Sequence, residues 1–126
     1  MVSIRHIKRL CRRIAGEFSP QRIVLFGSYA HGTATEDSDV DLPVILPCGG
    51  DPLAKAAEIR QAIDVPFALD LLVRSPEVVR QRLAWNDFFL REVMEKGKLL
   101  YDAADRRMAP QSRGRLRQRP PRVPRS

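Results

Sequence analysis

The amino-acid sequence predicts an α/β fold. Short runs of β-forming residues alternate along the chain with segments whose apolar residues recur at helical spacing, which is the pattern of strands joined through helices. With 126 residues, of which 44% are hydrophobic and 29% charged, the chain has the size and composition of one globular domain. We place this domain at residues 1–105 and a C-terminal tail at residues 106–126.

The first predicted elements are a helix and a buried strand. Arginine and lysine residues separate apolar residues at helical spacing from residue 4 onward, and Gly16 and Pro20 mark the end of that helix. The apolar stripe consists of Ile4, Ile7, Leu10, Cys11 and Ile14. Residues 21–26 are rich in β-forming residues and stop at Gly27, which predicts a strand.

A short helical turn and a second strand follow. Ser28 is the predicted N-cap of a turn that Gly32 closes. After a polar loop, residues 39–46 have the pattern of a strand that contains Pro43. Because proline has no N–H to donate to a β-ladder, we expect this strand either at a sheet edge or bulged near the site.

The second half of the chain predicts two helices and two strands. Helical spacing covers residues 53–63, a run of β-forming residues covers 66–73, a longer helical pattern covers 76–96, and a short strand covers 98–101. The longer helix begins with Ser-Pro-Glu, which supplies an N-cap, a proline at the first helical position and an acid in the first turn.

Two aromatic residues lie off the apolar stripe of that longer helix. A continuous helix would leave Trp85 and Phe88 outside the main core, and an exposed aromatic pair often marks an interface. Alternatively, Asn86 and Asp87 end one helix and cap a second, which would turn both rings inward. The sequence favours neither arrangement.

Three aspartates are the candidate chemical groups. Asp39 and Asp41 are two residues apart in a predicted strand, so their side chains project to the same face. Two carboxylates facing one way repel unless a cation lies between them, and an all-oxygen pair suits Mg²⁺ or Mn²⁺. Asp70 is the polar residue of an otherwise apolar strand, and it reaches the same ions if its strand lies beside the second one. Three carboxylates around two cations suit in-line displacement at phosphorus.

Gly27 and Ser28 complete the predicted site. A glycine lets the backbone approach a phosphate, and the free N–H groups of a following helical turn, together with a serine hydroxyl, are phosphate donors. A lone Gly-Ser pair is usually only a turn, and Asp-x-Asp is most often a loop or cap motif. Their combination with Asp70 is what indicates a nucleotide site.

Gly27-Ser28, followed after ten residues by Asp39-x-Asp41, resembles the signature of the polymerase-β-type nucleotidyltransferases, in particular the minimal nucleotidyltransferase (MNT) group. The later segments ALDLLV and GKLLYD are similar to that group as well, and the likeness covers about residues 4–102. The resemblance implies a polymerase-β-like fold, which is a small mixed sheet with helices packed on it. This sequence departs from the family pattern at Tyr29, His31 and Pro43.

The resemblance also implies roles for the site residues. Asp39 and Asp41 would be ligands of two Mg²⁺ ions, with Mn²⁺ as a substitute, and Asp70 would be the third carboxylate, which assists the attacking hydroxyl. Gly27 and Ser28 would contact the phosphates of ATP. Asp37 is interpreted as a loop acid rather than a ligand.

A further implication concerns the partner. Members of the minimal group are antitoxins of two-component HEPN/MNT toxin–antitoxin systems, in which AMP is transferred to a tyrosine of the HEPN-type RNase toxin. We expect the same activity here, in a hetero-oligomer with the toxin, because no second domain to hold a small acceptor is evident in the sequence. The alternatives are nucleotidyl transfer to a small molecule or an RNA end, and a non-catalytic antitoxin that acts by binding alone.

The charge is concentrated at the C-terminal end, and the hydropathy pattern bears on the cellular location of the chain. The formal net charge is +7, but six arginines and no acidic residue lie in residues 108–126, together with four prolines. We expect a disordered tail, which is either a solvated segment without a function of its own or one that makes weak, salt-sensitive, nonspecific contact with nucleic acid. There is no membrane span or signal peptide pattern, and Cys11 and Cys48 lack metal-ligand spacing. We therefore expect a cytoplasmic protein with reduced thiols.

Overall fold

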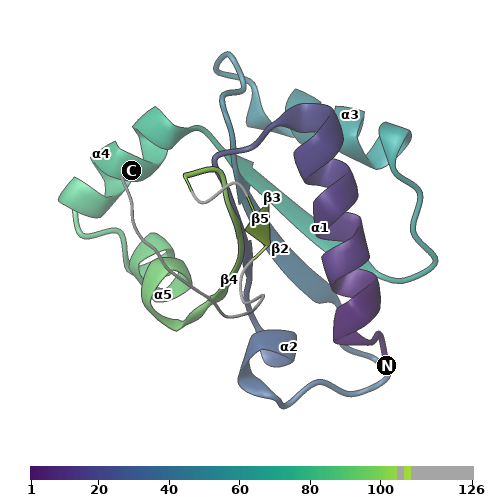
Figure 1. Cartoon of the computed structure of the whole chain (residues 1–126). Coiled ribbons are helices and arrows are strands. Elements are labelled where there is room, and N and C mark those ends of the chain that lie inside the picture. The colour runs from purple at the N-terminus through teal and green to yellow at the C-terminus, as the bar shows by residue number, and fades with distance from the viewer. Residues whose placement is uncertain (105–106, 109–126) are drawn as a thin grey trace, which may run out of the picture.

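A computed structural model of the chain describes residues 1–104 and 107–108. Its centre is a five-stranded sheet with the order β3-β2-β1-β4-β5 (Figure 1). The strands are β1 (Arg22–Leu25), β2 (Val40–Ile45), β3 (Leu69–Arg74), β4 (Lys98–Asp102) and β5 (Arg107–Met108). Strands β2 and β3 are parallel and the other neighbours are antiparallel, so the predicted mixed sheet is confirmed.

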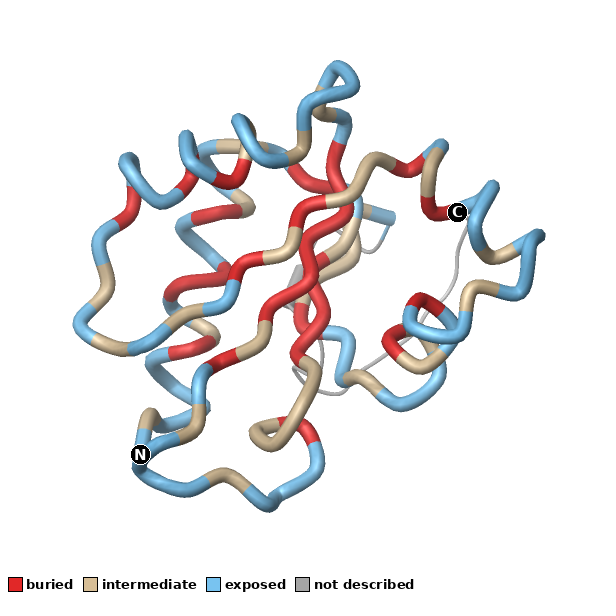
Figure 2. Tube along the Cα trace, turned by 180° about the vertical axis from the view of Figure 1, so that it is seen from behind, coloured by how far each residue is buried: buried red, intermediate tan, exposed pale blue. Residues whose placement is uncertain are grey.

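Helices cover both faces of the sheet. α1 (Ile4–Phe18) and α3 (Pro52–Ala62) lie on one side, and α4 (Pro76–Ala84) and α5 (Phe88–Lys96) lie on the other (Figure 1). The short helix α2 (Ser28–His31) lies at one end of the sheet. In Figure 2 the buried residues follow the strands and the inner faces of the helices. None of the helices in the described part of the chain is long and apolar enough to cross a membrane.

Alternate side chains of β2 point into the two layers on opposite faces of the sheet. Val40, Leu42 and Val44 belong to the main core, which they form with the apolar stripe of α1 and with α3. Since neighbouring residues of a strand point to opposite faces, Asp41, Pro43 and Ile45 face the layer of α4 and α5.

Helix α1 packs as its sequence predicts except at Ile4, the first residue of the predicted stripe, which is 49% exposed. The Ser3 hydroxyl accepts a hydrogen bond from the His6 N–H at the N-cap. Ile7, Leu10, Cys11 and Ile14 are buried. Burial raises the pKa of the Cys11 thiol to about 12, so this cysteine stays protonated near neutral pH, as expected of a core thiol.

Pro43 occupies a position that corrects the sequence prediction. Strand β2 lies between β1 and β3 and is not an edge strand. The Val40 N–H donates to the Ala68 carbonyl beside β3, so alternation directs the nitrogen of Pro43 toward β1. On that side the ladder pairs Ile23 with Val44 and then resumes only at Phe26 and Asp41. The register is the same on both sides of this interruption, which places Pro43 opposite Val24. Because proline has no N–H to donate, its position accounts for the interruption of the β1–β2 ladder.

The predicted helix 76–96 is two helices. α4 ends at Ala84, and Asp87 caps α5 by accepting a hydrogen bond from the Leu90 N–H at 3.0 Å. The break at Asn86 and Asp87 therefore occurs, but Trp85 and Phe88 are 69% and 77% exposed. The expectation that such a break would turn both rings inward is wrong.

The predicted tail, residues 106–126, lies outside the described residues except for β5. That strand pairs with β4 through Tyr101 and Met108 and through Asp102 and Arg107. Strand β5 thus lies beyond residue 105, where the sequence places the end of the domain.

Candidate active site

The parallel pairing of β2 and β3 brings two of the predicted aspartates together. Asp41 and Asp70 are direct partners in the ladder. In-register residues of neighbouring strands project to the same face of a sheet. Both carboxylates therefore project from the face on which α4 and α5 pack, at a position that these helices do not cover. Asp39 immediately precedes β2 and lies two residues from Asp41. Asp39 and Asp70 are exposed and Asp41 is half-buried, so the cluster is open to solvent.

Phe26, at the end of β1, stands in line with Asp41 and Asp70 on the same face of the sheet. Phe26 forms a bridge with Asp41, and its N–H donates to the Asp41 carbonyl oxygen at 3.0 Å. Phe26 therefore stands beside Asp41 on the same face, and its ring packs edge-to-face on Phe89 of α5 with 5.9 Å between centroids. The sequence did not single out Phe26, because only strand pairing shows that it neighbours the aspartates.

Gly27 lies directly against the Asp41 carboxylate. Its φ is +74°, and a Cβ atom built on it would overlap the Asp41 side chain. The Gly27 carbonyl accepts hydrogen bonds from the N–H groups of Ala30 and His31 at 3.0 and 3.2 Å, which starts α2. A glycine is therefore required here for two reasons, its backbone conformation and the close approach of the Asp41 carboxylate.

Ser28 has a different local position from the predicted one. Gly27 occupies the N-cap position of α2, and Ser28 is the first helical residue. An N-cap needs non-helical dihedral angles, which Gly27 adopts at φ +74° and ψ −154°. The Ser28 hydroxyl is therefore not used as the helix cap.

The charges of the three aspartates act on one another. Burial, followed by the negative charges of Asp70 and Asp39, raises the pKa of the Asp41 carboxyl, and a hydrogen bond with Asp70 adds to this. A divalent cation would offset such repulsion, and carboxylate oxygens are the donors that Mg²⁺ and Mn²⁺ prefer. The donor set therefore fits these ions. Within residues 1–104 and 107–108, however, no three acidic, histidine or cysteine side chains are drawn together as a closed metal cluster.

Tyr29, His31 and Asp37, which lie near the cluster in the sequence, have structural contacts. The Tyr29 hydroxyl accepts a hydrogen bond from the Val2 N–H at 3.0 Å, which ties the N-terminal segment to α2. His31 is exposed and lies edge-to-face against Phe26, with centroids 6.0 Å apart. Asp37 is exposed in the loop before β2, where its N–H donates to the Thr35 hydroxyl.

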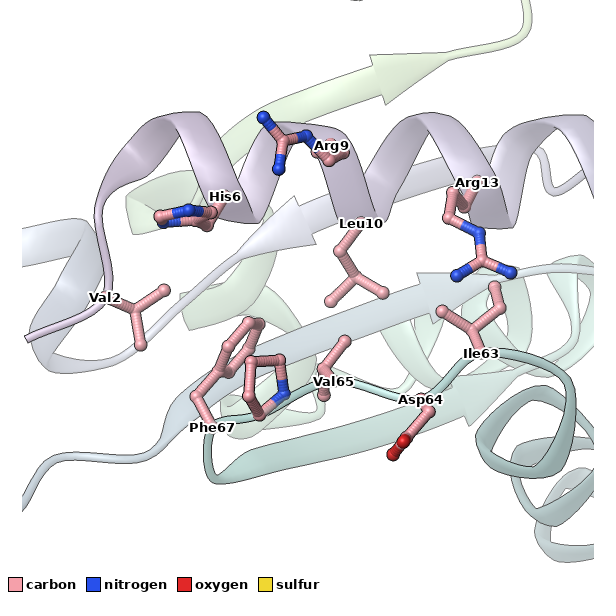
Figure 3. Close-up of a pocket in the computed structure, with 10 residues that line it drawn as sticks. Val2, His6, Arg9, Leu10, Arg13, Ile63, Asp64, Val65 and Phe67 are labelled. Atoms are coloured by element: carbon pink, nitrogen blue, oxygen red, sulfur yellow. The ribbon is translucent and has the colours of Figure 1, made fainter.

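A separate cavity lies on the opposite side of the sheet. It has a volume of about 480 Å³ and lies between α1 and residues 63–67 (Figure 3). His6, Arg9 and Arg13 line its α1 side, and Phe67 lies across from them. None of the three aspartates lines this cavity, so it is distinct from the carboxylate cluster.

Comparisons with known proteins identify the family of this chain. The model of the nucleotidyltransferase domain family matches residues 4–100. A protein of Methanocaldococcus jannaschii, named as a candidate protein adenylyltransferase, is 31% identical over 81 residues, which are 64% of this chain and 78% of that protein.

Two solved structures were compared with the fold. The crystal structure of a candidate nucleotidyltransferase from Sulfolobus solfataricus superposes with a TM-score of 0.57 at 16% identity, over 79% of this chain and 80% of that chain. A toxin–antitoxin crystal structure with AMP-PNP aligns with a TM-score of 0.45 at 23% identity, over 75% of this chain and 73% of that chain. At that level of similarity the second alignment adds nothing to the assignment.

Proposed function

Because this chain belongs to the nucleotidyltransferase domain family and is a nucleotidyltransferase, we propose that it transfers AMP from ATP to a tyrosine of a partner HEPN-type RNase toxin. The transfer silences the RNase, so the chain acts as its antitoxin. The observation that carries the proposal is the row of Asp41 and Asp70, with Asp39 beside it and Gly27 in contact with Asp41, at a solvent-open end of the sheet.

The three carboxylates have divided roles in this proposal. Asp39 and Asp41 would hold Mg²⁺, with Asp70 as the third ligand. When bound, two such ions neutralise the charge of the triphosphate and of the departing pyrophosphate. Asp70 is exposed at the side of the cluster away from Gly27, so it is the carboxylate that receives the proton of the incoming hydroxyl.

The nucleotide side of the site is the turn at Gly27 and Ser28. Gly27 has no side chain, so a phosphate can approach its backbone next to Asp41. The Ser28 hydroxyl is not used as a helix cap and can donate to a phosphate oxygen. The triphosphate would thus lie across the end of β1, with its α-phosphorus toward the carboxylates.

The transfer step itself is a displacement at the α-phosphorus. The tyrosine oxygen forms a bond to the α-phosphorus as the bond from that phosphorus to the β-phosphate oxygen breaks. Pyrophosphate leaves, and the phenol proton passes to Asp70. The products are pyrophosphate and a tyrosine that carries AMP through a phosphodiester.

A protein acceptor is supported by two observations. The M. jannaschii relative, 31% identical, is named for protein adenylyltransferase activity. In addition, Asp39 and Asp70 are exposed, so a side chain on the surface of a docked protein can reach them. The partner's own surface would then orient its tyrosine, which lowers the entropic part of the barrier.

Intact-mass measurement of the partner tests the proposal. Purified chain is incubated with a HEPN-type partner, ATP and Mg²⁺, and the partner is expected to gain the mass of one or more AMP units. Asp39→Asn should abolish the gain. The matched control is Asp37→Asn, which removes a neighbouring exposed charge and should leave the transfer unchanged. An unchanged partner mass with the wild-type chain would refute the proposal.

A further inference from the structure

The corner between α4 and α5 is a rigid backbone structure. The Asp87 N–H donates to the Arg82 carbonyl and the Asn86 N–H donates to the Leu83 carbonyl, which is the Schellman arrangement of a helix C-terminus. Asn86 has the left-handed conformation that this motif requires, with φ +60°. Asp87 then caps α5 and pairs with Arg82 at 3.4 Å. The chain at this corner is fixed by hydrogen bonds on both sides.

This rigid corner displays aromatic side chains to solvent. Trp85 is 69% exposed, Phe88 is 77% exposed and Phe89 is 41% exposed. We call these three residues the corner patch. Exposed aromatic residues on a fixed backbone are typical of binding hot spots, because little conformational entropy is lost when a partner covers them.

The corner patch is continuous with the candidate active site. Phe89 packs on Phe26, and Phe26 is both the neighbour of Gly27 in the chain and the bridge partner of Asp41. Phe26, Asp41 and Asp70 form one row on the face that α5 covers in part. A protein that covers the corner patch therefore lies beside the carboxylates on the same face of the sheet.

The area and charge of the corner patch favour a transient protein partner. Its exposed aromatic surface is about 400 Å², taking roughly 150–250 Å² for a whole aromatic side chain. A standard stable interface buries about 800 Å² on each partner, so this patch is about half of what a permanent dimer needs. Its charged rim is internally paired, Arg82 with Asp87 and Arg91 with Glu95. Nucleic acid backbones bind unpaired cations instead.

We propose that the corner patch, Trp85 with Phe88 and Phe89, is the docking surface for the acceptor protein, and that it holds the acceptor's hydroxyl side chain at the carboxylate row. The complementary surface on the acceptor is apolar and uncharged. This proposal rests on the proposed function, because it names the surface by which that function's acceptor is bound.

The test is the kinetics of AMP transfer to a HEPN-type partner. The double variant Trp85→Ala/Phe88→Ala is expected to raise the KM for the partner by about 30-fold or more, the effect of truncating a hot spot. The KM for ATP and the kcat at saturating partner should stay within about twofold. The matched control is Leu53→Ala, which removes an 81% exposed leucine from α3 and should change neither constant.

Two further measurements, thermal unfolding and light scattering, help to separate the outcomes. Thermal unfolding shows whether the double variant is folded, and the single variant Phe88→Ala replaces it if not. A partner KM within twofold of wild type, with Asp39→Asn still inactive, overturns the docking proposal and leaves the proposed function standing. No transfer by the wild-type chain overturns the proposed function itself. A loss of self-association in the double variant, measured by light scattering, would assign the patch to a second copy of the chain and also overturns the proposal.

Discussion

Gly27→Ala is the most informative single substitution, because the structure gives two separate costs for it. The first is conformational: φ +74° and ψ −154° define a region that is almost restricted to glycine. The second is steric, since the new Cβ would overlap the Asp41 carboxylate. The substitution must therefore move either the turn or the carboxylate.

The sizes of the two costs follow from these contacts. Backbone strain of this kind lowers the free energy of unfolding by about 1–3 kcal/mol. That loss is tolerable in a domain whose total stability is roughly 5–15 kcal/mol, so the variant should fold. A displaced catalytic carboxylate is more serious, because misplacement by about 1 Å lowers a rate on the order of 100-fold.

Gly32→Ala is the matched control. Gly32 has φ +76°, but nothing lies within 4 Å of a Cβ built there. Its strain of about 1–2 kcal/mol should appear in urea denaturation much as for Gly27→Ala, while AMP transfer should stay within a few-fold of wild type. Equal activity of the two variants would refute the claim that Gly27 is needed for its contact with Asp41.

Three other predictions concern the ions, the third carboxylate and the tail. Mg²⁺ at ten times its dissociation constant should raise the unfolding temperature of the wild-type chain by about 5–10 °C, and Asp39→Asn should lose most of this shift in the same scan. Asp70→Asn should retain ATP binding by calorimetry but transfer AMP at least about 100-fold more slowly, and a loss of ATP binding alone would contradict its role toward the hydroxyl. Truncation after Met108 should leave transfer unchanged and reduce retention on RNA at low salt, whereas a truncated chain that cannot modify its acceptor would show that the tail positions the substrate.

Local patterns predicted most of the helices and strands, for a physical reason. Helical and alternating periodicities are set by burial on one side of a single element, so they are visible within a few residues of sequence. The spacing of Asp39 and Asp41 fixes their shared face in the same local way. That Asp70 lies beside Asp41 depended on which strands pair, and the family resemblance supplied that information.

Features that depend on pairing between distant segments were not predictable. Pro43 shows that a ladder donor is missing, but only the β1–β2 pairing shows that the ladder is interrupted there on the side of β1. Asn86 and Asp87 signal a helix break, yet only the packed structure shows that Trp85 and Phe88 stay exposed beside it. Phe26 adjoins the site only through its bridge to Asp41.

RNase activity of a HEPN-type partner is the measurement that tests the central claim most directly, because it separates chemistry from binding. The partner is incubated with ATP and Mg²⁺ and with the wild-type chain, Asp37→Asn or Asp39→Asn, and RNA cleavage is then followed. We predict that the first two silence the RNase and that the partner stays active with Asp39→Asn. Silencing by Asp39→Asn with no change in the partner's mass would contradict the account, because binding alone would then be the mechanism.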